Sequence, residues 1–137
     1  MRLNHSVRAI LRNDSGQLVF IKREKADVIP YWVTPGGGVE DTDENLEAAL
    51  KREIMEEIGG QIEIMGVVFE LQRPLPDDLI QYTTFFSCKL LDYDLTQQSG
   101  PEFLDPSSGR YTIEEIDLAA IPTLNLKPSE LKDFLMQ

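Results

Sequence analysis

The feature that most constrains this chain is an acidic helix bounded by glycines. Residues 36–60 begin with three consecutive glycines, pass through an acidic stretch, continue as LEAALKREIMEEI and end at Gly59-Gly60. This pattern predicts a helix over about residues 45–58, with Asp43 or Thr42 as its N-cap, because short polar side chains favour helix starts and glycine favours helix ends. At about 100° per residue, one face of this helix is apolar in its first half and acidic in its second. Any fold of this chain must accommodate that mixed face.

The carboxylates on this face repel one another. Glu53 and Glu57 are four residues apart and Glu56 lies beside them. A solvated acidic face explains most charge runs, but like charges at this spacing destabilise a helix, and acidic residues at its C-terminal end oppose the macrodipole. Two carboxylates about 4 Å apart repel by about 4 kcal/mol at intermediate dielectric. Lys51 and Arg52 offset part of this repulsion. A divalent cation would offset more, and carboxylate oxygens with open water positions are the coordination that Mg²⁺ prefers.

The overall charge narrows the choice of partners. The chain has 137 residues, a length typical of one domain, and a net charge of −11. Such a surface repels phosphate backbones, so we expect no nucleic-acid polymer and no anionic membrane as a partner. Cys88 is the single cysteine, and the first ten residues lack the apolar run of a signal peptide. We therefore expect a cytoplasmic protein, and an anionic substrate would need a cation between it and the protein.

The remaining sequence predicts strands on both sides of the acidic helix and a second helix near the end. Pro128 opens a short amphipathic helix whose apolar side carries Leu131, Phe134 and Leu135. Alternating or β-branched patterns predict five strands, over about residues 6–12, 17–23, 61–71, 80–91 and 110–116. Residues 72–80 and 92–109 are expected to be loops. This order predicts a mixed α/β sandwich, with helices on both sides of a sheet.

The spacing of the glycines and acidic residues is specific. Five residues separate Gly38 from Glu44, and seven more separate Glu44 from Arg52. Arg52 begins the stretch Arg-Glu-Ile-Met-Glu-Glu-Ile-Gly, residues 52–59. This spacing resembles the signature of the Nudix hydrolases, the MutT-like pyrophosphohydrolases. Gly60 departs from it, because an apolar residue is usual there, and residues 41–43 lack a glycine that is common before the first glutamate. The resemblance implies a Nudix-like α/β/α sandwich with a mixed β-sheet, as one domain over residues 1–137 with its signature loop and helix at 38–60.

The resemblance also implies a metal site. It assigns Glu53, Glu56 and Glu57 as ligands of Mg²⁺ or Mn²⁺ and as catalytic residues, one of them acting as general base. A backbone carbonyl from the glycine before the signature, here Gly37, is a further expected ligand.

Other residues are expected to orient the carboxylates or to bind substrate. Arg52 and Glu44 resemble the orienting ion pair of the family, although a surface salt bridge is the alternative. Arg23, Gly37 and Gly38 are expected to contact phosphate, against the alternatives of a solvated strand end and a simple turn. A further acidic residue outside the signature is expected in the site. We predict Glu102, with Glu70 and Asp105 as rivals.

The predicted function is hydrolysis of a pyrophosphate bond in a nucleoside diphosphate linked to another moiety. The substrate classes are nucleoside triphosphates, nucleotide sugars, ADP-ribose and dinucleoside polyphosphates, with discrimination expected in the 72–80 and 92–109 loops. The partner is thus a small nucleotide, and dimeric relatives leave a homodimer open. Two alternatives remain: a non-catalytic Nudix-fold domain that binds a nucleotide for regulation, and an acidic module that binds a basic partner.

Overall fold

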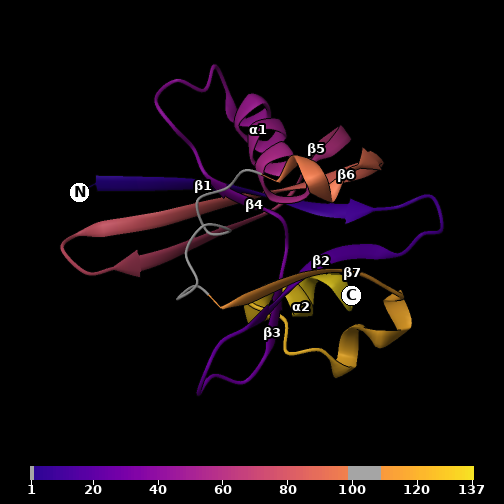
Figure 1. Ribbon diagram of the computed structural model, residues 1–137. Coiled ribbons are helices and arrows are strands. Elements are labelled where there is room, and N and C mark those ends of the chain that lie inside the picture. The colour runs from indigo at the N-terminus through magenta and orange to yellow at the C-terminus, as the bar shows by residue number, and fades with distance from the viewer. Residues whose placement is uncertain (1, 99–108) are drawn as a thin grey trace.

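The computed structural model describes residues 2–98 and 109–137 (Figure 1). Within these residues, no helix combines the length and apolar character needed to span a membrane. The elements follow in this order: β1 (Arg2–Arg12), β2 (Leu18–Glu24), β3 (Tyr31–Val33), β4 (Gly36–Gly38), α1 (Leu46–Ile58), β5 (Gly60–Leu75), β6 (Leu79–Tyr93), the 3-10 helix η1 (Leu95–Gln97), β7 (Arg110–Ile116), the 3-10 helix η4 (Leu118–Thr123) and α2 (Ser129–Leu135).

The strands form one mixed sheet. Its order is β3-β2-β1-β6-β5, while β4 pairs with β1 and β7 pairs with β2. β1 runs parallel to β6 along its whole length, and the other pairs are antiparallel. β1 and β2 are joined by a tight turn as predicted, but they pair only at Arg12 and Leu18 and then diverge. The prediction of an α/β fold with a mixed sheet is confirmed.

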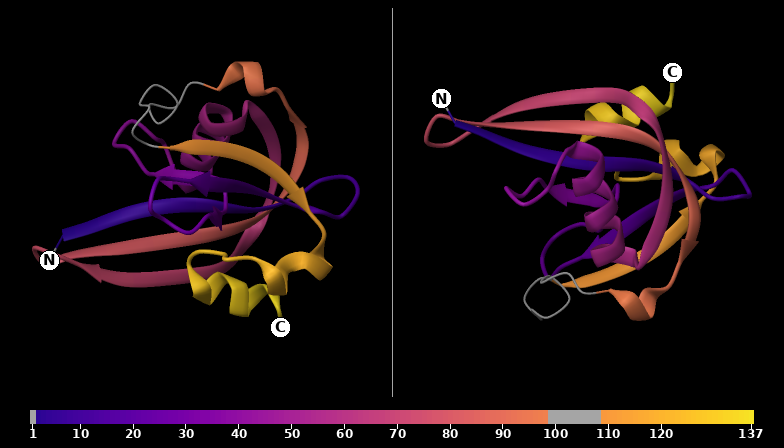
Figure 2. Two further views of the ribbon diagram at one scale, coloured as in Figure 1. Left: turned by 60° about the horizontal axis from the view of Figure 1, so that its bottom comes forward. Right: turned by 90° about the horizontal axis from the view of Figure 1, so that it is seen from above.

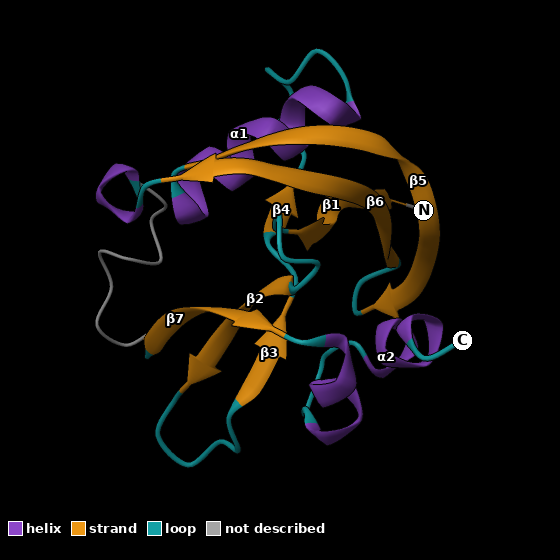
Figure 3. Ribbon diagram, turned by 90° about the vertical axis from the view of Figure 1, so that its right-hand side faces the viewer, coloured by secondary structure: helices purple, strands orange, loops and turns teal. Residues whose placement is uncertain are grey.

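Alternation along the strands gives the sheet two apolar faces. On one face, Val7, Ala9 and Leu11 of β1 pack with Leu50 and other apolar residues of α1. On the opposite face, apolar residues of β1, β2 and β6 pack with η4 and α2, and this second cluster contains Ile10, Leu18, Phe20, Phe85, Ile121, Leu126 and Leu131. Figure 3 shows α1 and α2 on opposite sides of the strands. The side chains of a strand point alternately to the two faces, so both helices find a buried surface.

The acidic helix lies where the sequence places it, but its cap differs. Asn45, and neither Asp43 nor Thr42, is the N-cap of α1, and its Oδ1 accepts the N–H of Ala48 at 2.8 Å. The helix ends at Gly59, whose φ of 62° is left-handed. α2 begins after Pro128 as predicted, and Leu131 is fully buried.

The predicted loop over residues 72–80 is wrong. β5 and β6 continue through these residues and are joined by a tight turn, in which Asp77 and Asp78 have φ of 64° and 57°. The resulting hairpin runs beside the N-terminal part of β1 (Figure 2). The sequence signal was weak because this turn holds Asp77 followed by Asp78, without the glycine of the preferred Asn-Gly and Asp-Gly pairs.

Candidate active site

The acidic end of α1, the glycines of β4 and the ends of β2 and β3 surround one cavity. It has a volume of about 470 Å³. Glu53, Glu56 and Glu57 come from α1, and Gly36–Gly38 form the adjoining wall. Arg23, Tyr31 and Tyr111 lie on the wall formed by β2, β3 and β7. The fold therefore brings the three predicted metal ligands together with the predicted phosphate-binding residues Arg23, Gly37 and Gly38.

Glu57 is the most deeply buried of the three carboxylates. Its exposed fraction is 7%, and its Oε1 accepts the backbone N–H of Gly36 at 2.6 Å. A charge-assisted bond of this length fixes the carboxylate direction. The C-terminal end of α1 is also held in place, because Gln98 Nε2 donates to the backbone carbonyl of Glu57 at 2.7 Å.

Glu53 occupies a space that only glycine leaves open. A Cβ atom on Gly37 would collide with the carboxylate group of Glu53. The absence of a side chain at position 37 thus lets the β4 backbone lie directly against the acidic face of α1.

Arg52 holds the acidic groups in place, but its main partner is not the predicted one. Its Nε and Nη2 donate to the two oxygens of Asp43, both at 2.9 Å, as a bidentate pair. Its Nη1 donates to Glu53 at 2.9 Å and to Glu56 at 3.3 Å. The predicted Arg52–Glu44 ion pair is therefore wrong.

The turn before α1 explains the exchange of partner. The backbone N–H of Glu40 donates to the Asp43 carboxylate at 2.8 Å, and the N–H of Asp43 donates back to the carbonyl of Glu40 at 3.0 Å. This closed turn directs the short Asp43 side chain to Arg52, while Glu44 is exposed. Arg52 Nη2 also donates to the carbonyl of Gly38 at 3.0 Å, so that carbonyl already has a partner inside the protein.

These contacts change the acidity of both partners. The hydrogen bond from Arg52, followed by the backbone bond from Glu40, lowers the pKa of Asp43 to about 2. The same bond with Asp43 raises the pKa of Arg52 above its ordinary value. Both groups therefore stay charged at neutral pH.

Arg23 of β2 lines the same cavity as the glutamates. Its guanidinium carbon lies 4.2 Å from the ring centroid of Tyr111 and 5.9 Å from that of Tyr31. Both aromatic faces attract the cation and restrict its movement. A positive group thus lies in the same cavity as the three carboxylates.

The donor set suits a hard divalent cation in its chemistry. Three carboxylates and the glycine backbone of β4 offer the oxygen ligands that Mg²⁺ and Mn²⁺ prefer. Among residues 2–98 and 109–137, however, no three His, Cys, Asp or Glu side chains already converge as ligands. Arg52 engages Glu53 and Glu56, and the Gly36 N–H engages Glu57, so the carboxylates are oriented by protein donors.

Several site residues were not predicted. Asp43 was considered only as a helix cap, and Tyr31 and Tyr111 carry no local signal because β3 and β7 bring them together across the fold. Arg8 also lines the cavity. A charged residue within the apolar run of residues 7–11 was the available signal for it. Glu102 and its rival Asp105 lie outside the described residues, and Glu70 is on β5, outside the set that lines this cavity.

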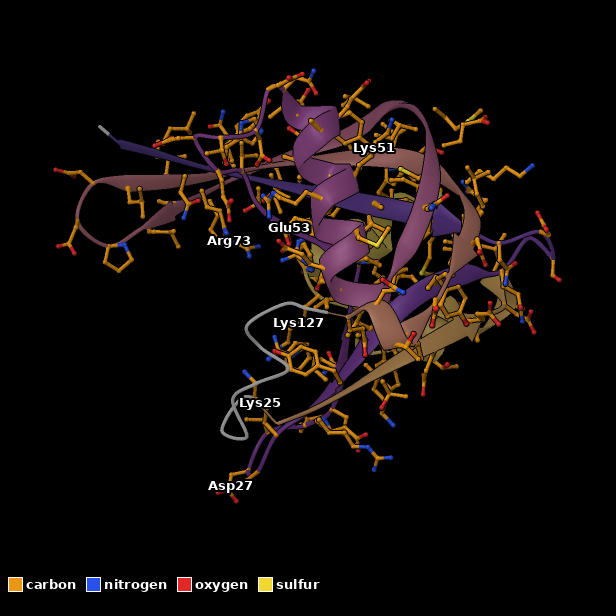
Figure 4. All side chains as sticks on the ribbon, turned by 45° about the horizontal axis from the view of Figure 1, so that its top comes forward. Lys25, Asp27, Lys51, Glu53, Arg73 and Lys127 are labelled. Carbon is orange, nitrogen blue, oxygen red and sulfur yellow. The ribbon has the colours of Figure 1, made fainter. Side chains whose placement is uncertain are left out.

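A second cavity adjoins the first. It also has a volume of about 470 Å³, and it lies between the β5–β6 hairpin and the segment that leads into α2. Its wall mixes apolar residues such as Phe85 and Leu126 with polar ones such as Gln81 and Asn125. Figure 4 shows Glu53 on α1, Arg73 on the β5–β6 hairpin and Lys127 before α2. Glu53 lines the first cavity, and Arg73 and Lys127 line the second.

The family model described as NUDIX domain matches residues 2–132. The chain belongs to the NUDIX domain family. This match confirms the resemblance seen in the signature.

Individual relatives agree with this assignment. A protein of Bacillus subtilis (strain 168), provisionally named an 8-oxo-dGTP diphosphatase, is 38% identical over 65 residues, which are 47% of this chain and 41% of that protein. The match thus spans less than half the length of this curated relative.

Among solved structures, the MutT protein of Methanosarcina mazei Go1 has a TM-score of 0.70 at 21% identity, covering 98% of this chain and 91% of that one. The MutT NUDIX hydrolase of Burkholderia pseudomallei has a TM-score of 0.69 at 20% identity, and the match covers 100% of this chain and 98% of that one. At these identities the two structures establish the shared NUDIX fold.

Proposed function

We propose that this chain is a single-domain pyrophosphohydrolase. It cleaves a pyrophosphate bond in a nucleoside diphosphate linked to another moiety and requires a divalent cation, Mg²⁺ or Mn²⁺. The observation that carries the proposal is the cavity that the three glutamates of α1 line together with Arg23 and the glycines of β4. Carboxylates for a cation and a guanidinium for phosphate oxygens are the groups that phosphoryl transfer needs.

Each residue has a task in this reaction. Glu53, Glu56 and Glu57 would hold the cation, with the backbone of Gly37 beside them. When bound, that cation neutralises charge on the attacking and leaving oxygens. Arg52 keeps the carboxylates of Glu53 and Glu56 in position, and Arg23 of β2 neutralises charge on a substrate phosphate.

The second cavity supports a nucleotide as the substrate. It adjoins the carboxylate cavity and offers apolar surface with a few polar groups, which is the usual lining of a small-molecule site. A nucleoside there would leave its phosphates at the carboxylates. The name of the Bacillus subtilis relative makes oxidised purine triphosphates the first class to test.

A substrate panel with Mg²⁺ tests the proposal. The compounds are 8-oxo-dGTP, the ordinary nucleoside triphosphates, UDP-glucose, ADP-ribose and diadenosine polyphosphates, each followed by phosphate release with coupled phosphatases. We expect hydrolysis of at least one class by the wild type and a loss of at least about 100-fold in Glu57→Gln. The matched control is Glu47→Gln, an exposed glutamate on the same helix, which should keep wild-type rates.

Two results would contradict the proposal. One is equal turnover in Glu57→Gln and wild type. The other is tight nucleotide binding with no cleavage of any compound, which would instead favour a non-catalytic regulatory domain.

A further inference from the structure

Arg8 is a charged residue in the central strand of the sheet. Its neighbours Val7 and Ala9 are fully buried, and in register it lies between Gly36 of β4 and Phe85 of β6. Its side chain is half-buried. Strand alternation places Arg8 on the same face as Ile10, which belongs to the apolar cluster around α2. An arginine at such a position displaces apolar packing, so it needs a reason.

Among the described residues, the partners of Arg8 leave its charge uncompensated. Nη1 donates to the backbone carbonyl of Thr34 at 2.8 Å. In the described part of the chain, no carboxylate lies at ion-pair distance from Arg8. A guanidinium has five N–H donors, and one neutral carbonyl does not balance its charge.

Arg8 lies at the boundary between the two cavities. Among the residues that the structure describes, Arg8 and Val33 line both of them. A ligand that extends from the mixed apolar cavity to the glutamates must therefore pass Arg8. Val33 offers only apolar contact at this boundary.

The stem of Arg8 is also tied to the carboxylate site. A Cβ atom on Gly36 would lie 2.7 Å from the Cα and 3.0 Å from the Cδ of Arg8, so the stem packs directly on the Gly36 backbone. The N–H of that same glycine donates to Glu57. Arg8 and Glu57 thus contact the same residue, and one carries a positive group and the other a negative group.

We propose that Arg8 is a substrate-binding residue that contacts the phosphate attached to the nucleoside, at the boundary between the two cavities. Guanidinium groups bind phosphate oxygens in a bidentate manner, and the chain as a whole carries a net charge of −11, so a local positive group is needed there. The inference rests on the proposed function for the orientation of the ligand. It adds to that function a residue that lies between the nucleoside of the ligand and the phosphates at the glutamates.

The experiment compares nucleosides with their monophosphates. Binding of the four 2′-deoxynucleosides and their 5′-monophosphates is measured by calorimetry in EDTA for wild type, Arg8→Gln, Arg8→Lys and Arg12→Gln. Glutamine keeps an N–H for the Thr34 carbonyl but loses the charge, whereas lysine keeps the charge. Arg12 is an exposed arginine at an alternate position of the same strand and serves as the control.

We expect the wild type to bind at least one monophosphate about tenfold more tightly than its nucleoside. Arg8→Gln should lose this preference, Arg8→Lys should keep most of it, and Arg12→Gln should match the wild type. A purely structural arginine would give a different result, with similar preferences in all four proteins. That result, or a wild type without any preference for the phosphate, would overturn the proposal.

The hydrolysis panel separates this inference from the proposed function. If the wild type cleaves no compound but Arg8→Gln loses the phosphate preference, the proposed function fails and the role of Arg8 stands. If the wild type cleaves a substrate and Arg8→Gln keeps both its kcat/KM and the phosphate preference, the role of Arg8 fails alone.

Discussion

At the scale of single residues, the site depends on groups that are held by several bonds at once. Arg52 binds Asp43 with two nitrogens and reaches Glu53 and Glu56 with the third. The family resemblance implied that Arg52 orients the carboxylates, but it implied the wrong partner, Glu44. Helix periodicity could not decide between positions 43 and 44, because both lie before the first turn of α1, where the local turn fixes the side-chain directions.

Replacing Arg52 by lysine should impair catalysis more than folding. Lysine keeps the charge but cannot make a bidentate pair with Asp43 while also reaching Glu53 and Glu56. We expect kcat/KM to fall by about 100-fold, because loss of position in an active site has effects of this size. Kinetics and thermal unfolding of Arg52→Lys check this. Unchanged kinetics in the lysine variant would show that charge alone is sufficient.

Asp43 should make the stability of the protein depend on acid pH. Its pKa is lowered from 3.8 to about 2 in the fold, so its contribution is present above about pH 4 and is lost as the pH falls toward 2. In Asp43→Asn the stability that Asp43 contributes above about pH 4 should be absent, so the protein should lose less stability as the pH falls toward 2. Thermal midpoints of both proteins between pH 6 and pH 2 measure the difference. Two parallel curves would contradict the assigned pairing.

At the scale of elements, the pattern of apolar and polar residues and its helix or strand periodicity predicted most of the helices and strands. The acidic helix begins and ends within one residue of its predicted bounds, because caps and an apolar stripe mark it locally. The hairpin of β5 and β6 was predicted as two strands with a long loop. The loop was wrong because Asp77 and Asp78 adopt left-handed φ values, which a sequence without glycine does not reveal.

The turn of this hairpin gives a stability prediction. Glycine adopts positive φ without the Cβ contact that aspartate suffers, so Asp78→Gly should stabilise the protein by about 0.5–1 kcal/mol. Urea unfolding followed by circular dichroism measures the change. Because the turn lies at the far end of the hairpin, hydrolysis rates should stay the same. Destabilisation by this glycine would argue against the left-handed turn.

At the scale of the whole molecule, the layers could be predicted but the cavities could not. Alternating strands and two amphipathic helices require a sheet covered on both sides, and the structure has this arrangement. The cavity walls combine Arg8, Arg23, Tyr31 and Tyr111, which are brought together by strand order rather than by spacing in the sequence. From the sequence and its family resemblance, only the continuous segment of residues 36–59 and Arg23 could be assigned to this site.

The central claim is that the acidic face of α1 binds a divalent cation. Titration with Mn²⁺, followed by electron paramagnetic resonance, tests it most directly in wild type, Glu53→Gln, Glu56→Gln, Glu57→Gln and the control Glu47→Gln. We predict that wild type and Glu47→Gln bind Mn²⁺ alike, and that each of the other three variants binds at least about tenfold more weakly, because each loses a charged ligand. Equal Mn²⁺ affinity in all five proteins would contradict the claim.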